Sequence, residues 1–153
     1  MNNKPINRFR CIFPAKSVNE GFARSAMAAF ASQLDPRVND IADIKTAVSE
    51  AVTNCIVHAY RDSPLPPEKR MVELRGEYYG DGRFVMTIKD CGRGISDIKQ
   101  AMEPLFTTAP EEERAGLGFA VMQSFCDKVR VKSEPGKGTT VTLEKTFGAE
   151  NDR

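Results

Sequence analysis

The sequence has no tryptophan, a single histidine and almost no net charge. Its 22 basic and 21 acidic residues give a formal charge of +1, so long-range attraction for nucleic acid or anionic lipid is absent. The sequence also lacks an apolar run long enough to cross a bilayer, and no hydrophobic signal segment stands at its N-terminus. We therefore expect a cytoplasmic protein that binds neither nucleic acid nor membrane directly.

The four cysteines follow no metal-binding pattern. Cys11, Cys55, Cys91 and Cys126 lie far apart, without a C-x-x-C pair, and His58 is the only histidine. This excludes the common zinc motifs and predicts reduced thiols that serve mainly as small apolar residues. Cys91 is the exception, because it lies in a glycine-containing turn where we expect its thiol to be exposed.

The most informative stretch is a predicted helix that ends near Tyr60. Glu50, Asn54 and His58 recur every four residues, so they form one polar ridge on a helix. The opposite side carries a core-facing stripe of Ile41, Ile44, Val48, Val52, Cys55 and Ala59. Such a ridge is more often a solvated face than a site, but three later glycine-rich turns make it a candidate site.

The remaining pattern predicts a fixed order of strands and helices. We expect strands at 8–13, 72–79, 83–89, 128–133 and 139–147, and helices at 18–34, 39–60, 97–102 and 119–126. A capping box from Ser17 to Glu20 opens the first helix, and Asn39 or Asp40 caps the second. Loops cover 61–70 and 104–114. Since several strands are hairpin-linked, the sequence predicts one domain over 1–153, an α/β two-layer sandwich of a mixed, mostly antiparallel sheet with helices on one face.

The turn before residue 119 has the composition of a phosphate site. Gly116 and Gly118, which flank Leu117, let the backbone approach a ligand closely, and the following helix would direct its N–H groups at an anion. Arg114 adds a charge suited to phosphate oxygens. The alternative is an ordinary loop with a helix cap. The familiar G-x-x-x-x-G-K-[ST] loop is excluded, because the sequence does not contain it.

Two further positions suit a nucleotide. Asp90 follows an apolar strand and precedes Gly92 and Gly94, so its carboxylate could accept a hydrogen bond from an exocyclic amine such as that of adenine; the alternative is a turn aspartate that caps its own backbone. Asn54 has an amide oxygen that can complete a magnesium octahedron of phosphates and water. Glu50, one turn earlier, could act as a base.

These signals occur in the order found in the GHKL nucleotide-binding superfamily, which includes gyrase, Hsp90-type chaperones, histidine kinases and MutL. Four motifs resemble its conserved boxes: Glu50-x-x-x-Asn54 the N-box, Asp90-x-Gly92-x-Gly94 the first glycine box, Gly116-x-Gly118 the second and Gly136-x-Gly138-Thr139 the last. The resemblance implies the Bergerat fold, with Mg-ATP as ligand and ADP as product.

The same resemblance implies roles for single residues. Asp90, helped by Thr139, would read the adenine amine; Asn54 would hold Mg²⁺; and residues 104–115 would form a mobile ATP lid. The other implied nucleotide contacts are His58, Gly92, Gly94, Thr107, Thr108, Gly116, Leu117 and Gly118. From its position alone, His58 could equally be a packed residue at the helix end.

Within the superfamily, the sequence is similar to the anti-sigma factor kinases of spore-forming bacteria. The similar segments are Glu20-Gly-Phe-Ala-Arg24, Ala28-Ala-Phe30, Gln33-Leu-Asp-Pro36, Ser49-Glu-Ala-Val-Thr-Asn54 and Pro104-Leu-Phe-Thr-Thr108. This similarity implies a homodimer that binds a sigma factor and phosphorylates an anti-anti-sigma factor, with Glu20 and Arg24 on the partner surface. The alternative for that pair is a surface i,i+4 ion pair worth about 0.5 kcal/mol or less.

The residues favour a serine kinase over its relatives. ATP hydrolases of this kind carry a second domain, for which 153 residues leave no room, and a histidine kinase needs its histidine on a helical hairpin, not at His58. A serine hydroxyl gains most from a base, so Glu50 would accept its proton while Arg114 stabilises the transition state. The alternatives are a related stress-response kinase, a detached histidine-kinase ATPase domain, and an ATP-sensing binding module without significant phosphotransfer.

Overall fold

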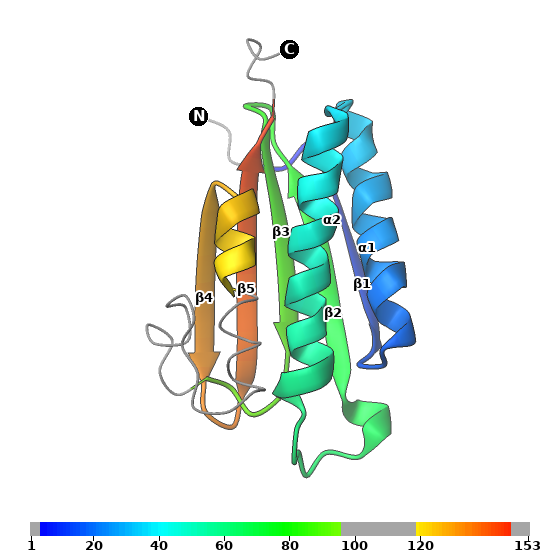
Figure 1. Ribbon diagram of the computed structural model, residues 1–153, viewed down its shortest axis with the longest axis vertical. Coiled ribbons are helices and arrows are strands. Elements are labelled where there is room, and N and C mark those ends of the chain that lie inside the picture. Colours follow the sequence, from blue (N-terminus) through cyan, green and yellow to red (C-terminus); the bar gives the residue numbers. More distant parts are fainter. Residues whose placement is uncertain (1–3, 96–118, 148–153) are drawn as a thin grey trace.

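The structure is a computed structural model of the chain, and it describes residues 4–95 and 119–147 (Figure 1). The main elements, in chain order, are β1 (Asn7–Pro14), α1 (Val18–Ala31), α2 (Val38–Thr53), β2 (Met71–Tyr78), β3 (Arg83–Asp90), β4 (Lys128–Glu134) and β5 (Gly138–Thr146). The short elements are η1 (Ser32–Leu34), η2 (Asn54–Ala59) and η3 (Pro67–Lys69). Residues 119–125 are also helical.

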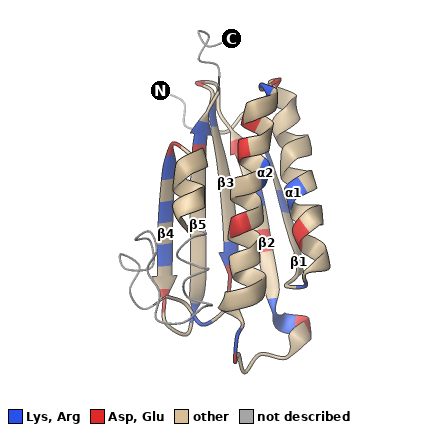
Figure 2. Ribbon diagram, in the orientation of Figure 1, with Lys and Arg blue, Asp and Glu red and all other residues tan. Residues whose placement is uncertain are grey.

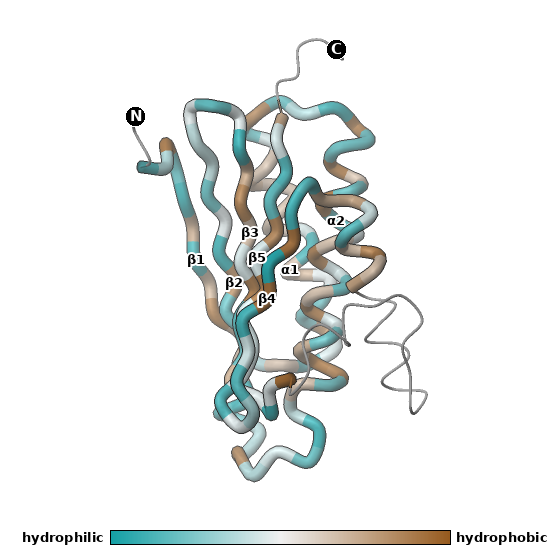
Figure 3. The backbone as a smooth tube through the Cα atoms, turned by 90° about the vertical axis from the view of Figure 1, so that its left-hand side faces the viewer, coloured by the Kyte–Doolittle hydropathy of each residue, from teal (hydrophilic) through white to brown (hydrophobic). Residues whose placement is uncertain are grey.

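The five strands form one sheet in the order β1-β2-β3-β5-β4, and each of their four pairings is antiparallel. α1 and α2 lie together against one face of this sheet, which leaves two layers when the molecule is turned by 90° (Figure 3). Burial alternates along β2, where Val72 and Leu74 face the helices and Arg75 faces solvent. The predicted fold class, an α/β sandwich with helices on one face, is confirmed.

The core lies between the helices and the sheet. The predicted stripe of α2 is confirmed at Ile44, Val48, Val52 and Cys55, which are buried, whereas Ile41 packs against the core only in part. Apolar side chains removed from water contribute roughly 25 cal/mol per Å², so this stripe fixes which face of α2 turns outward. The ridge at Glu50 and Asn54 is consequently placed on the opposite face.

Charge is distributed unevenly over the two layers (Figure 2). Basic side chains alternate along the edge strand β4, where Lys128, Arg130 and Lys132 are exposed, and charge on an edge strand discourages pairing with another chain. Lys145 of β5 reaches Asp43 of α2 at 3.3 Å and ties the two layers together.

Within the described residues, no helix combines the length and the apolar character that a membrane span requires.

The predicted helix starts need correction. Ser17 precedes α1, but its side chain makes no capping hydrogen bond; the capping box is wrong because Glu20 bonds Arg24 and Ser49 instead. α1 ends at Ala31 and passes into the 3-10 turn η1. α2 starts at Val38, one residue before the first predicted cap, and the Asp40 carboxylate accepts the Arg37 N–H at 3.2 Å.

The second helix is not one unbroken α-helix to Tyr60, as predicted. The α-helix ends at Thr53, and Asn54–Ala59 forms a π-helix. Single-turn π segments occur frequently at functional sites, and this one contains two residues of the predicted ridge. The predicted strands agree with the observed ones to within one residue at each end. The predicted helix at 97–102, the lid at 104–115 and the C-terminal residues 148–153 lie outside the described residues.

Candidate functional site

Glu50 lies on α2, and Asn54 and His58 lie on η2. Glu50 and Asn54 are half-buried, whereas His58 is buried with Nδ1 3.3 Å from an Arg61 nitrogen. The Asn54 Nδ2 atom is buried and has no hydrogen-bond partner among the described residues. A buried polar atom in that state costs about 1–3 kcal/mol, so this amide is prepared for a partner that protein atoms in the described part of the chain do not supply.

Asp90 is 5% exposed and accepts hydrogen bonds from three elements. Its Oδ1 accepts the N–H of Gly92 at 2.9 Å and that of Thr139 at 3.3 Å, and its Oδ2 accepts the thiol of Cys55 at 3.5 Å. Burial raises the pKa of the Asp90 carboxyl, and these three hydrogen bonds oppose the rise. Asp90 does cap its own turn, through the N–H of Gly92. It is also held by the N–H of Thr139 on the neighbouring strand β5 and by the thiol of Cys55 on η2.

The first glycine turn is clamped between η2 and the β4–β5 connection. Arg93 donates its N–H to the Ala59 carbonyl at 2.7 Å, and the Arg93 carbonyl accepts the N–H of Gly136 at 2.7 Å. A Cβ on Gly92 would overlap the Ala59 carbonyl, and one on Gly94 would overlap the Glu134 carbonyl. Only glycine permits this approach, so the turn has one position relative to the π-helix.

The last glycine box completes the same cradle from β5. Gly138 has φ +113°, and a Cβ there would overlap the Asp90 carbonyl. The next residue, Thr139, exchanges a hydrogen bond with the Ser133 hydroxyl at 2.7 Å, and that hydroxyl accepts the Ile95 N–H at 2.7 Å. The sequence analysis does not identify Ser133 as a site residue. The β4–β5 register, which pairs Ser133 with Thr139, is the signal that indicates it.

Tyr60 is a second residue that sequence reasoning missed. Its hydroxyl donates to the Met71 carbonyl at 2.6 Å and accepts the N–H of Cys91 at 2.8 Å. Burial raises the pKa of Tyr60 to about 12, so the hydroxyl keeps its proton and both hydrogen bonds at physiological pH. The Cys91 side chain is exposed, as predicted. Tyr60 therefore anchors the backbone next to Asp90 to the start of β2.

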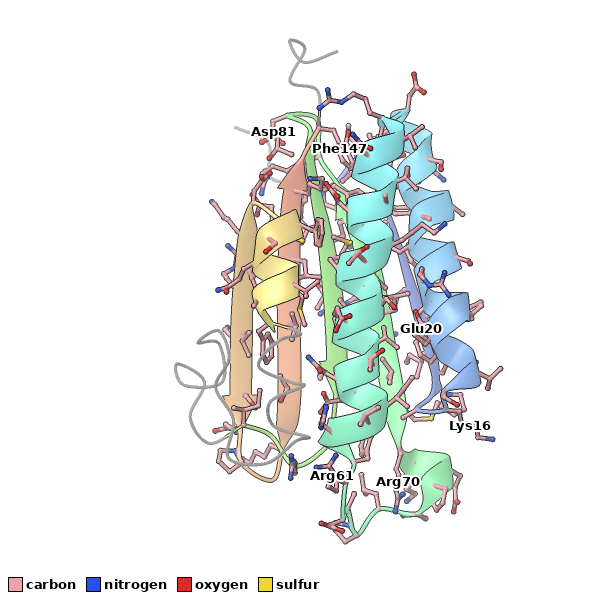
Figure 4. All side chains as sticks on the ribbon, in the orientation of Figure 1. Lys16, Glu20, Arg61, Arg70, Asp81 and Phe147 are labelled. Carbon is pink, nitrogen blue, oxygen red and sulfur yellow. The ribbon has the colours of Figure 1, made fainter. Side chains whose placement is uncertain are left out.

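Glu20 and Arg24 form the predicted i,i+4 pair on α1, with Arg24 Nε 3.0 Å from Glu20 Oε2. The same carboxylate accepts the hydroxyl of Ser49 on α2, and Figure 4 shows Glu20 between the two helices. The pKa of the Glu20 carboxyl is lowered, and the hydrogen bond from Ser49 is the largest cause. The pair is thus connected to the residue that precedes Glu50.

The remaining predicted site residues, Thr107, Thr108, Arg114, Gly116, Leu117 and Gly118, lie outside the described residues. Asp90, Gly92, Gly94 and Thr139 lie at one end of the sheet, where β3 ends and β5 begins, and η2 contacts them there through Cys55 and Ala59 (Figure 1). Within residues 4–95 and 119–147, no group of three or more His, Cys, Asp or Glu side chains has a metal-binding arrangement.

The arrangement of an antiparallel sheet, two covering helices and two glycine turns defines a histidine kinase-like ATPase domain, and the family model of that description matches residues 13–145. Curated anti-sigma F factors match nearly the whole chain. The one from Caldanaerobacter subterraneus subsp. tengcongensis is 51% identical over 93% of this chain and 95% of its own length; the one from Geobacillus stearothermophilus is 48% identical over 92% and 93%. This chain belongs to the anti-sigma F factor family.

Solved structures with low sequence identity share the fold. The SiaB-SiaC complex from Pseudomonas aeruginosa contains a chain with a TM-score of 0.67 at 11% identity, matched over 92% of this chain and 89% of that one. The RsbU and RsbW domains of Rv1364c from Mycobacterium tuberculosis give a TM-score of 0.64 at 19% identity, over 94% of this chain and 33% of that one. At these identities the likeness concerns the fold alone.

Proposed function

We propose that this protein binds Mg-ATP and uses it to phosphorylate a serine on an anti-anti-sigma partner, and that it binds and inhibits a sporulation sigma factor of the F type. The observation that supports the proposal most strongly is the cradle around Asp90, where three donors hold a buried carboxylate beside glycines that a side chain would block. The anti-sigma F relatives support the partner classes.

The adenine end of the nucleotide fits this cradle. Oδ1 of Asp90 is occupied by Gly92 and Thr139, whereas Oδ2 receives only the weak thiol donor within the described residues. Carboxylate oxygens have about two acceptor positions each, so Oδ2 retains capacity for the exocyclic amine of adenine. Thr139 lies beside the same carboxylate and is placed to assist.

Asn54 suits a magnesium site. Its amide is buried, and Nδ2 lacks a partner in the described part of the chain; a half-turn of the amide presents the oxygen instead. Mg²⁺ is commonly held by one or two protein oxygens together with phosphates and water, so a single Asn is sufficient. Bound Mg²⁺ would neutralise phosphate charge during transfer.

In this proposal Glu50, four residues before Asn54, acts as the base. As the partner's serine oxygen bonds to the γ-phosphorus, the bond to the β–γ bridging oxygen breaks, ADP leaves, and the serine proton passes to the Glu50 carboxylate. From the sequence, Arg114 supplies positive charge to the transferring group. His58 is buried against Arg61, and we propose that it supports the phosphate end of the pocket.

Calorimetry with Mg-ATP tests the proposal. We expect binding by the unsubstituted protein and a loss of roughly 10- to 100-fold in Asp90→Asn, because the amide replaces one acceptor oxygen with a donor. Asp81→Asn is the control, since Asp81 is an exposed aspartate at the opposite end of the sheet from Arg61 (Figure 4). Absence of ATP binding by the folded, unsubstituted protein would refute the proposal.

The partner surface is proposed on α1. Val18 and Phe22 of α1 are 75% and 52% exposed, and the same helix carries the Glu20–Arg24 pair on a different side. A helix that presents both exposed apolar residues and charge is typical of protein interfaces. The alternative, an isolated surface ion pair, predicts no effect on partners.

Charge reversal at Arg24 separates these interpretations. We expect Arg24→Glu to weaken binding of sigma factor and anti-anti-sigma factor at least about tenfold, as for a charged interface contact, while ATP affinity and melting temperature change little. Lys69→Glu, at an exposed position on η3, should leave both partners bound. Pull-down and calorimetry with purified partners measure the difference, and unchanged partner binding in Arg24→Glu would exclude the interface.

We also propose that the chain acts in the cytoplasm as a single domain and as a homodimer. The family model spans residues 13–145, which supports one domain, and a sigma factor partner requires a cytoplasmic protein. Sedimentation velocity tests the dimer directly. Incubation with labelled ATP and an anti-anti-sigma protein distinguishes the kinase from an ATP-sensing module, because only the kinase transfers label to serine.

A further inference from the structure

The Asp90 carboxylate is held by two backbone donors and one side-chain donor. Gly92 and Thr139 donate N–H groups to Oδ1, and Cys55 donates its thiol to Oδ2 at 3.5 Å. Any residue at positions 92 and 139 would carry a backbone N–H, except proline. The donor at position 55 depends on side-chain identity. Of the three described donors to this carboxylate, Cys55 is therefore the one whose hydrogen bond depends on which amino acid occupies the position.

We propose that Cys55 is a positioning residue for base recognition: its buried thiol holds the Asp90 carboxylate as an acceptor for the exocyclic amine of adenine, and thereby sets the preference for adenine over 6-oxopurines. This inference rests on the proposed function, because it requires Asp90 to read the base. It assigns a role to a thiol that the sequence alone indicated to be an apolar filler.

The placement of Cys55 suits this role. It is 4% exposed, lies on the π-helix directly after Asn54, and packs in the core under the cradle. Its Sγ atom lies 3.5 Å from Oδ2 of Asp90. A buried thiol that donates a hydrogen bond there fixes Oδ2 as an oxygen that accepts.

The protonation state of Asp90 decides which base edge it fits. An ionised carboxylate accepts from the 6-amino group of adenine, whereas a protonated one donates and suits the 6-carbonyl group of hypoxanthine. Burial raises the pKa of Asp90, and the Cys55 hydrogen bond opposes this. Loss of the thiol should raise that pKa further, so ATP binding should fail at a higher pH than in the unsubstituted protein.

Other titratable groups near Asp90 are compatible with this assignment. Tyr60 at the end of η2 interacts with the Asp90 charge but stays neutral, since its pKa is about 12. Cys91 follows Asp90 in the chain, and its exposed side chain is not among the hydrogen-bond donors to the carboxylate in the described structure. The charged residues that line the adjacent open depression are Lys89, Lys132, Glu134 and Lys137. None of them is altered by the substitutions below.

The test compares ATP with inosine triphosphate, in which a carbonyl replaces the amine, by calorimetry with Mg²⁺ across a pH series. Cys55→Val keeps similar volume without a donor, and Cys55→Ser restores a donor. We expect Cys55→Val to weaken ATP about tenfold and inosine triphosphate less than about twofold, with the acid limb of ATP binding shifted to higher pH. Cys55→Ser should recover the preference. Cys11→Ala, which removes a half-buried thiol from β1, should change neither quantity.

Two outcomes overturn the inference. If Cys55→Val keeps both the nucleotide preference and the pH limb, the thiol does not position Asp90; a purely structural role would weaken both nucleotides equally and lower the melting temperature. Should Cys55→Val fail to fold, Cys55→Ala is measured in the same way and judged by the same criteria. Asp90→Asn distinguishes failure of this inference from failure of the proposed function. If Asp90→Asn retains the preference for ATP, Asp90 does not read the base and the proposed function fails. If Asp90→Asn loses the preference while Cys55→Val retains it, only the role of Cys55 is refuted.

Discussion

We expect Glu50→Ala to retain Mg-ATP binding and to lose the proposed phosphotransfer to serine by a factor of about 10²–10⁴, the usual contribution of a positioned general base. Glu50 lies on the outward face of α2, half-buried and one turn before Asn54. Its removal should leave the Asp90 cradle and the Asn54 amide in place, so we expect the nucleotide contacts proposed for them to remain. Single-turnover transfer of labelled phosphate to an anti-anti-sigma partner measures the loss.

Glu50→Gln is the matched variant for this experiment. The amide keeps the shape and hydrogen-bonding capacity of the carboxylate but cannot accept the serine proton at physiological pH. If Glu50 is the base, Gln and Ala lose transfer to a similar extent while calorimetry gives an unchanged ATP affinity. Transfer by Glu50→Gln within about tenfold of the unsubstituted rate would show that Glu50 only positions the reactants.

The part of the site that could be predicted from the sequence is the part encoded by local spacing. Glu50 and Asn54 are both half-buried, and their spacing predicts one shared face because four residues make about one helical turn. Asp90, Gly92 and Gly138 could be identified by their place at strand ends and in turns. In each case, the residue and the reason for its position lie within a few residues of each other.

The contacts that the sequence did not reveal join segments that are far apart along the chain. Tyr60 anchors the backbone of Cys91, Ser133 supports Thr139 and Ile95, and Ser49 bonds Glu20 across two helices. No periodicity reports such pairs, because they depend on strand register and helix packing. The predicted capping box was wrong for the same reason, because the Glu20 carboxylate accepts the hydroxyl of Ser49 on α2 instead of an N–H group at the start of α1.

The π-helix also could not be predicted from the sequence. It explains how the two halves of the site, the ridge that contains Asn54 and the turn that follows Asp90, come into contact. The π-helix Asn54–Ala59 ends at the Ala59 carbonyl, which accepts the N–H of Arg93 at 2.7 Å. It also places the Cys55 thiol against Asp90. The ridge that contains Asn54 and the turn that contains Asp90 are therefore held in one arrangement by a backbone contact that any larger residue at 92 would disturb.

We expect Gly92→Ala to move the turn at Gly92 away from the π-helix and to destabilise the protein by about 3 kcal/mol, because the added methyl group must displace packed atoms. The new Cβ overlaps the Ala59 carbonyl and also crowds the Ala59 side chain. The turn must move away from η2, which carries Asp90 away from the ridge at Asn54. We expect ATP affinity to fall by about 100-fold or more, since 1.4 kcal/mol corresponds to tenfold.

Gly80→Ala is the control for this substitution. Gly80 lies in the β2–β3 connection, and among the described residues a Cβ there meets only Ile6, at an ordinary distance of 3.7 Å. It should change the free energy of unfolding by less than about 1 kcal/mol and leave ATP binding intact. Urea unfolding and calorimetry on both variants give the comparison. The ratio of the two effects matters most: if Gly92→Ala resembles Gly80→Ala in both measurements, the turn does not depend on its contact with the π-helix, and the two halves of the site are positioned independently.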